Sequence, residues 1–249
     1  METVPSHSYF HKMDKDDNLT DIYLRRTNSK VAGYLYHEMK IFDHVCKNNN
    51  INYWAEGGTL LGAIRNTGLI PWDDDLDVQL APGDEGVLET EEVTKQFHER
   101  GFELRPIWFG YKLCPKDLPS FGRLYKEEDF TGEGWLGTYP WPFLDIFLTT
   151  YDLAIADKII YRSDVAQGWY PNFHFWDIEL FPLKRIRFGP IEINVPQNPY
   201  PYLTRVYGSD WNEYALEGMD HSTGKRNPHP IKVKIVTRTP AEYEFSEIP

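Results

Sequence analysis

The sequence predicts a mixed α/β fold, with helices concentrated in the first half of the chain. Three features support this expectation. Apolar residues recur at helical spacing over residues 30–47. Short stretches rich in β-formers dominate from residue 102 onward. Finally, helical and strand-like segments follow one another without an internal repeat. We expect residues 1–28 to form an irregular N-terminal arm and residues 29–249 to form one domain.

The elements follow in order from these patterns. Val31, Leu35, Met39 and Phe42 would share one face of the first helix. Alternation then predicts a short strand over residues 51–55, followed by the turn Gly57-Gly58-Thr59, with Thr59 placed to cap a helix over residues 60–65. The remaining expected elements are a strand at 72–80, a helix at 83–97, strands at 102–108, 111–113, 121–125 and 143–149, a hairpin of 184–188 with 191–195, and a last helix at 201–208.

Composition narrows the class of protein. The chain is 41% hydrophobic and 26% charged, as in soluble globular proteins. Its net charge of −12 repels phosphate backbones and argues against a nucleic-acid partner. A phosphate-bearing substrate would therefore need local positive charge, which a carboxylate-bound divalent cation supplies. The 15% aromatic content indicates either an aromatic-rich core or rings that stack on a sugar or base.

The number of cysteines and the length of the apolar runs help to predict the cellular compartment of the protein. Two cysteines allow at most one disulfide and cannot form a thiolate zinc site of the usual kind. The N-terminus lacks the apolar run of a signal peptide, and no window reaches the ~18 apolar residues of a membrane span. We expect a soluble, cytoplasmic chain, or a Golgi-lumen one if a leader or anchor is missing from this sequence.

The segment around Asp73, Asp75 and Asp77 is the main candidate site. On a strand these carboxylates would project to one face, about 6.6 Å apart along the strand, with Leu76, Val78 and Leu80 on the other face. Like charges at such spacing repel, and oxygen-only ligands favour Mg²⁺ or Mn²⁺. The alternative interpretation is a solvated acidic turn.

Asp145 is a second acidic candidate, because all its neighbours in Phe143–Leu148 are apolar. A buried carboxylate needs a metal or a charged partner. It is predicted to be a further metal ligand from an adjacent strand, with a salt bridge to an arginine as the alternative.

The glycine turn is a candidate phosphate site. Amides at a helix N-terminus, together with the Thr59 hydroxyl, can bind an anion, and the turn precedes the acidic segment by 15 to 20 residues. Arg65 at the end of the same helix could contact substrate or satisfy the last carbonyl groups. The alternative for Gly57-Gly58-Thr59 is an ordinary strand-to-helix turn.

Residues 53–80, YWAEGGTLLGAIRNTGLIPWDDDLDVQL, resemble the signature of the LicD family, which includes bacterial phosphocholine transferases and the animal fukutin and fukutin-related proteins. Residues 179–211 are similar to the C-terminal part of the fukutin-related proteins. The resemblance implies a nucleotidyltransferase fold of the DNA polymerase beta type. It also implies transfer of a phosphorylated alcohol from a CDP-alcohol, such as CDP-choline or CDP-ribitol, onto a glycan or glycoconjugate, with release of CMP.

The resemblance assigns roles residue by residue. Asp75 and Asp77 fall on the metal-binding pair, Asp145 resembles the third carboxylate, and Asp73 is the preceding acidic residue. Gly57, Gly58 and Thr59 fall on the phosphate-binding turn. Two alternatives stay open: a metal-dependent glycosyltransferase that uses a nucleotide sugar, and a non-catalytic glycan-binding or regulatory protein of the same fold.

Overall fold

A mixed sheet forms the centre of the molecule in the computed structural model, which describes residues 26–126, 138–220, 225–235 and 238–245. The sheet has seven strands. Five of them run in the order β1-β2-β7-β4-β3, while β8 pairs with β7 and β9 pairs with β8. Only β2 and β7 pair in parallel; every other pair in this sheet is antiparallel. The strands are β1 (Tyr53–Ala55), β2 (Leu76–Leu80), β3 (Phe102–Ile107), β4 (Gly110–Pro115), β7 (Leu144–Tyr151), β8 (Lys158–Tyr161) and β9 (Phe175–Trp176).

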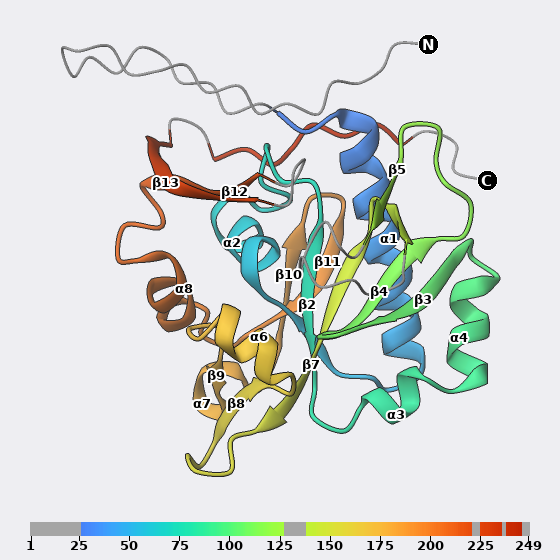
Figure 1. The fold of residues 1–249 in the computed structure, drawn as a ribbon, viewed down its shortest axis with the longest axis horizontal. Helices are drawn as coiled ribbons and strands as arrows, with labels where there is room; N and C mark the ends of the chain where they lie inside the picture. The colour runs from blue at the N-terminus through green and yellow to red at the C-terminus, as the bar shows by residue number, and fades with distance from the viewer. Residues whose placement is uncertain (1–25, 127–137, 221–224, 236–237, 246–249) are drawn as a thin grey trace.

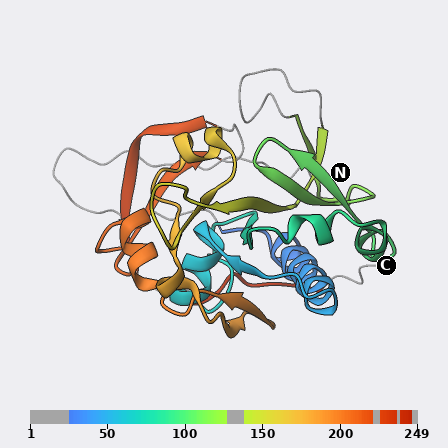
Figure 2. The ribbon, with the colours of Figure 1, turned by 90° about the horizontal axis from the view of Figure 1, so that it is seen from below.

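Helices cover the sheet on both sides. The helices are α1 (Ser29–Asn48), α2 (Gly57–Arg65), α3 (Glu85–Leu88), α4 (Glu91–His98), α6 (Asp164–Trp169), α7 (Asp177–Leu180) and α8 (Tyr200–Tyr207). Figure 1 shows β2 and β7 side by side, with α4 next to β3 at one end. In the view of Figure 2, α1 and α2 lie below β7 and α6 lies above it.

Two apolar clusters fill the two sides of the sheet. The larger one joins α1, α2 and α8 to Leu76, Val78 and Leu80 of β2. The smaller one is mostly aromatic and contains Phe109, Phe143, Phe147, Tyr139 and Tyr161. Many rings therefore pack within the core, as one of the two interpretations of the aromatic content predicted. Side chains alternate between the two faces along β2, so Asp77 lies on the face opposite Leu76, Val78 and Leu80.

Most predicted elements are present, with shifted bounds. α1 confirms the helix at 30–47, and the hairpin β10 (Lys184–Phe188) with β11 (Ile191–Val195) has the predicted bounds. The predicted helix at 83–97 is two helices, α3 and α4, because Thr90 begins a new helix by accepting a hydrogen bond from Val93 N. The last predicted helix is α8, which ends at Gly208 with φ +87°.

Other elements were not predicted. They include β8, α6, β9 and α7, and the pair β12 (Tyr214–Asp220) with β13 (Lys225–Lys234). β5 (Arg123–Lys126) corresponds to the predicted strand at 121–125, and it forms a small hairpin with β6 (Thr138–Trp141), which was not predicted. The predicted N-terminal arm lies outside the described residues up to residue 25.

Two further findings bear on the sequence-based expectations. Cys46 and Cys114 are both buried and free, so no disulfide joins them. Within the described ranges, no helix is both long and apolar enough to cross a membrane.

Candidate functional site

Asp77 and Asp145 lie directly opposite each other on adjacent strands. They are register partners in the parallel pair of β2 and β7, and each is the second residue of its strand. Register partners project to the same face of a sheet. The carboxylate predicted from the acidic segment and the one predicted from Phe143–Leu148 therefore come together at one point.

The strand does not extend as far as the sequence predicted. β2 begins at Leu76, so Asp73 and Asp75 lie in the loop before it, not on a strand over 72–80. Two carbonyl groups of this loop accept hydrogen bonds from distant side chains: Thr27 Oγ1 donates to Asp73 O at 2.6 Å, and Trp141 Nε1 donates to Asp74 O at 3.0 Å. These long-range bonds replace strand pairing.

Asp75, Asp77 and Asp145 form a compact carboxylate group. One oxygen from each of the three lies within 4.8 Å of the other two. The pKa of Asp77 is raised well above its usual range by burial and by the charges of Asp75, Asp145, Glu56 and Asp73. Three hard oxygen donors at this separation suit a divalent cation that prefers carboxylates.

Asp73, Asp74 and Asp75 form a second group with the same separation limit. Asp74 lies 3.6 Å from the Arg123 guanidinium, which sequence reasoning did not pair with it. Asp75 belongs to both groups and links the loop to the sheet.

The first turn of α2 packs against these carboxylates. β1 is antiparallel to β2, so the end of β1 lies beside the start of β2, where Asp77 is. A Cβ added to Gly57, which has φ +53°, would lie 3.0 Å from Asp77 Oδ2, and one added to Gly58 would lie 2.5 Å from Asp73 Oδ2. The two glycines therefore allow the carboxylates to approach the backbone of the turn.

Thr59 has a different role from the predicted cap. α2 begins at Gly57 with Glu56 as its N-cap, so the expectation that Thr59 caps a helix at 60–65 is wrong. The Thr59 hydroxyl instead accepts a hydrogen bond from the Asp77 amide at 2.8 Å. The Gly57 amide donates to the Tyr202 hydroxyl at 3.1 Å. Both contacts fix the turn to the strand and to α8.

A buried polar network continues from the carboxylates. Gln79, two residues after Asp77 on the same face of β2, donates to Glu56 at 2.7 Å and accepts from Trp54 Nε1 at 3.0 Å. Tyr161 also donates to Glu56 at 2.7 Å. Burial raises the pKa of Glu56 to about 8, so this carboxyl can hold a proton at neutral pH.

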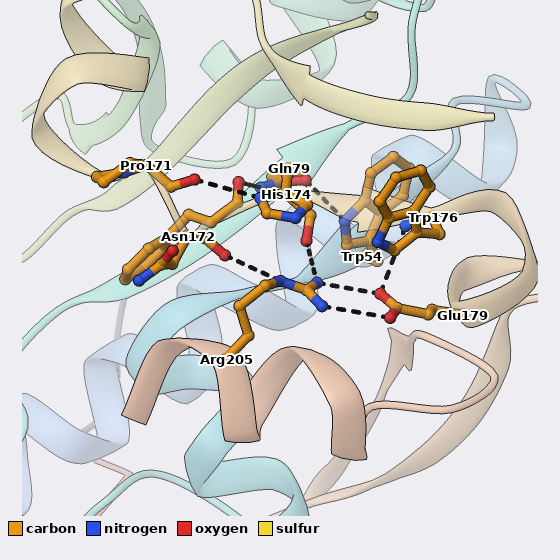
Figure 3. A network of polar contacts seen from close by, with 9 residues as sticks. Trp54, Gln79, Pro171, Asn172, His174, Trp176, Glu179 and Arg205 are labelled. Atoms are coloured by element: carbon orange, nitrogen blue, oxygen red, sulfur yellow. Dashed lines mark hydrogen bonds and ion pairs between the residues drawn. The ribbon is translucent and has the colours of Figure 1, made fainter. Parts of the chain in front are cut away.

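The network joins the sheet to the C-terminal elements. Figure 3 shows Arg205 of α8 between Glu179 and the backbone around His174. Its guanidinium lies 3.0 Å from Glu179 Oε2 and also donates to the carbonyl groups of Asn172 and His174. Gln79 contacts the adjacent carbonyl of Phe173. This arrangement fixes α8, and with it the Tyr202 hydroxyl that binds the turn.

Arg65 lies at the end of α2 and is 6% exposed. It donates to Asn66 Oδ1 at 3.0 Å and to Trp211 O at 3.1 Å, and it lies over the Trp72 ring. Burial lowers its pKa to about 10, and the charge of Asp73 acts in the opposite direction. The arginine is therefore both part of the packing and within the electric field of the site.

Lys112 is a site residue that the sequence analysis did not find. It is the register partner of Asp145 on β4, and its ammonium forms an ion pair with that carboxylate. The alternative considered for Asp145 was an arginine partner, whereas the structure provides a lysine. A polar residue in the otherwise apolar 109–114 segment was the available indication in the sequence.

Fold and site together describe a mixed α/β domain with a carboxylate centre beside a glycine turn. Residues 50–198, more than half of the chain, match the family model described as "LicD/FKTN/FKRP, nucleotidyltransferase domain". The chain belongs to the LicD family, as its resemblance indicated.

Similar proteins include both uncharacterised and named relatives. An uncharacterised protein of Rickettsia prowazekii is 34% identical over 197 residues, which cover 79% of this chain and 62% of that protein. The human ribitol 5-phosphate transferase FKRP is 30% identical over 178 residues, covering 64% and 32% of the two chains. The lipopolysaccharide cholinephosphotransferase LicD of Haemophilus influenzae is 54% identical over 39 residues, covering 16% and 15%. The chain thus spans less than two thirds of the length of each of these relatives.

Proposed function

We propose that this protein is a metal-dependent transferase that moves a phosphorylated alcohol from a CDP-alcohol onto a glycan acceptor and releases CMP. The observation that carries the proposal is the approach of Asp75, Asp77 and Asp145 to within 4.8 Å of one another against the glycine turn of α2. Family membership and the two relatives named as ribitol phosphate and choline phosphate transferases support the reaction class.

The carboxylate set fits a hard divalent cation. Asp75, Asp77 and Asp145 would hold Mg²⁺ or Mn²⁺, because these ions prefer several oxygen donors at short separation. Burial and repulsion from the neighbouring carboxylates raise the pKa of Asp77, and a bound cation would neutralise these negative charges. The cation would supply charge stabilisation for the diphosphate and its leaving oxygen.

Other residues around the centre would contact the donor. Gly58 is the partly exposed member of the turn and lies against Asp73. Its amide, with that of Thr59, belongs to the first turn of α2, where the helix dipole favours a phosphate. Gly57 and the Thr59 hydroxyl would hold this turn in place through Tyr202 and Asp77. Arg65 would add positive charge from the far end of α2.

The reaction would form one bond and break another at the same phosphorus. An acceptor hydroxyl oxygen attacks the phosphorus that carries the alcohol, the bond to the bridging oxygen breaks, and CMP leaves with the electron pair. Asp73 is our choice as acceptor of the hydroxyl proton. Asp145 is engaged in the buried ion pair with Lys112, whereas Asp73 is partly exposed on the loop.

The arrangement of the site also supports a proposal for the fold type and the domain boundaries. We propose that the sheet of β1, β2 and β7 with α2 is the nucleotidyltransferase core of the DNA polymerase beta type. The pair of carboxylates on neighbouring strands, next to a glycine turn that opens a helix, supports this assignment. Residues 29–249 would form the catalytic domain, preceded by an arm over residues 1–28.

A donor screen tests the proposal. The purified chain is incubated with CDP-choline, CDP-ribitol, CDP-glycerol or nucleotide sugars, in Mg²⁺, Mn²⁺ or EDTA, and released nucleotide is separated by chromatography. CMP release from one CDP-alcohol, lost in EDTA and in Asp75→Asn, supports the proposal. Release of a nucleotide only from nucleotide sugars, with a glycosidic product by mass spectrometry, contradicts it.

A matched variant controls for the loss of a carboxylate. Glu92 is an exposed residue in the first turn of α4, at the far end of the sheet from β2. Glu92→Gln should release CMP at the wild-type rate.

A further inference from the structure

Lys112 is a fully buried ammonium inside the candidate site. Its side chain is 1% exposed, against 12% for its partner Asp145. A buried ammonium is rare unless it is paired, because desolvation strongly disfavours the charge. Because so little of its surface is exposed, Lys112 is not placed to bind a substrate phosphate. Its ammonium interacts with groups of the protein instead.

The ammonium lies among aromatic rings. Lys112 Nζ is 3.5 Å from the centroid of Phe143, 5.5 Å from that of Phe109 and 5.9 Å from that of Tyr139. The faces of such rings attract a cation, more strongly where water is excluded. The rings come from two stretches of the chain, the turn before β4 and the residues from β6 to the start of β7, so the position of the ammonium is determined by the packed core.

The charge of Lys112 is placed in line with the carboxylates. Asp77 pairs in register with Asp145, and Asp145 pairs in register with Lys112, so the three side chains form one row across β2, β7 and β4. Asp145 therefore has a fixed positive charge on one side and the acidic group of Asp75 and Asp77 on the other. The nearby Glu38 of α1 is also buried, and burial raises its pKa well above the usual range. Glu38 therefore adds little negative charge that Lys112 would have to compensate.

We propose that Lys112 is a positioning residue that supplies the countercharge of Asp145 and holds this carboxylate beside Asp77 when no cation is bound. The inference rests on the proposed function. Between turnovers the cation would at times be absent, and Asp145 would then need another countercharge. Lys112 keeps the third ligand in place during that interval.

Thermal unfolding with and without cation tests this role. Lys112→Met keeps the length of the side chain and removes its charge. In EDTA its Tm should fall by on the order of 10 °C, because a buried carboxylate loses its partner. Saturating Mn²⁺ should recover more than half of this loss, so the cation-induced shift in Tm should exceed that of the wild type by more than about 5 °C.

A double variant separates countercharge from packing. In Lys112→Met/Asp145→Asn no buried charge is left without a partner, so its Tm in EDTA should lie clearly above that of Lys112→Met. Lys112→Arg, which keeps the charge, should retain a small cation-induced shift like that of the wild type.

Four outcomes would overturn the inference. The first is an unchanged Tm for Lys112→Met in EDTA. The second is an equal loss of Tm with and without Mn²⁺, and the third is failure of both Lys112→Met and the double variant to fold, because each of these indicates a packing role alone. The fourth is a wild-type chain that binds no Mn²⁺ by electron paramagnetic resonance. That result contradicts the proposed function as well, whereas the first three leave it intact.

Discussion

Asp77 of β2 and Asp145 of β7 are register partners in the parallel strand pair of the sheet, although 68 positions separate them in the sequence. With Asp75 they bring three carboxylate oxygens within 4.8 Å of one another. The pKa of Asp77 is raised by burial and by these neighbours, so its negative charge is destabilising in the folded chain without a cation.

The first prediction concerns Asp77→Asn. Removing this charge should lower CMP release by roughly 10³-fold or more, because a ligand of the cation is lost. In EDTA at pH 8 the same variant should unfold at a higher temperature than the wild type, since repulsion with Asp75 and Asp145 is relieved. Chromatography of CMP and calorimetric melting check the two parts. A variant that is inactive and also less stable in EDTA would indicate a structural role for Asp77.

The sequence predicted the site residues that local patterns identify, and it missed features that depend on contacts between residues far apart in the chain. Asp75, Asp77 and Asp145 were selected from local patterns, and their register placed them together. The loop conformation of Asp73 was not predicted, because it depends on bonds from Thr27 and Trp141, which are distant in the sequence.

Lys112 and Glu56 were missed for a similar reason. The partner of Lys112 lies 33 residues away on another strand, and strand order cannot be derived from one sequence. Helix α1, in contrast, was predicted closely, because its apolar spacing is local.

The second prediction concerns Gly58→Ala. The added Cβ would lie 2.5 Å from Asp73 Oδ2, so this carboxylate must move, whereas alanine itself is favourable in a helix. We expect a melting temperature near that of the wild type and CMP release reduced about 10-fold or more. Gly86→Ala in α3 is the control, because nothing lies within 4 Å of its added Cβ. Equal activity of the two variants would contradict a role for the turn.

The third prediction concerns the Thr59 hydroxyl, which accepts a hydrogen bond from the Asp77 amide at 2.8 Å. Thr59→Val has nearly the same shape but leaves this amide without its partner. We expect a loss of about 1–3 kcal/mol in the free energy of unfolding, measured by urea denaturation. Thr59→Ser keeps the hydroxyl and should recover most of this loss. If serine and valine are equally destabilising, the hydrogen bond is not the cause.

The fourth prediction concerns pH. Burial raises the pKa of Glu56 to about 8 in the folded chain, against an ordinary value of about 4.3 for an unfolded glutamate. Between these two pKa values the folded state therefore binds one proton more than the unfolded state. Its free energy of unfolding is highest below the ordinary pKa and falls as pH rises, by up to about 1.4 kcal/mol per pH unit, until pH passes about 8.

Glu56→Gln should remove this slope. The glutamine oxygen can still accept from Gln79 and Tyr161, the two donors to Glu56. Urea denaturation at pH 5.5 and 8.5 should show a smaller difference for Glu56→Gln than for the wild type, and Glu92→Gln should behave as the wild type. An unchanged difference in Glu56→Gln would mean that Glu56 is already ionised at pH 5.5.

Binding of Mn²⁺ measured by electron paramagnetic resonance tests the central claim most directly, because it depends on no donor or acceptor. The carboxylate group predicts saturable binding to the wild-type chain and to Glu92→Gln, and a loss of at least about 10-fold in affinity for Asp75→Asn and Asp77→Asn. Equal affinity of the wild type and Asp77→Asn, or no saturable binding at all, would contradict it.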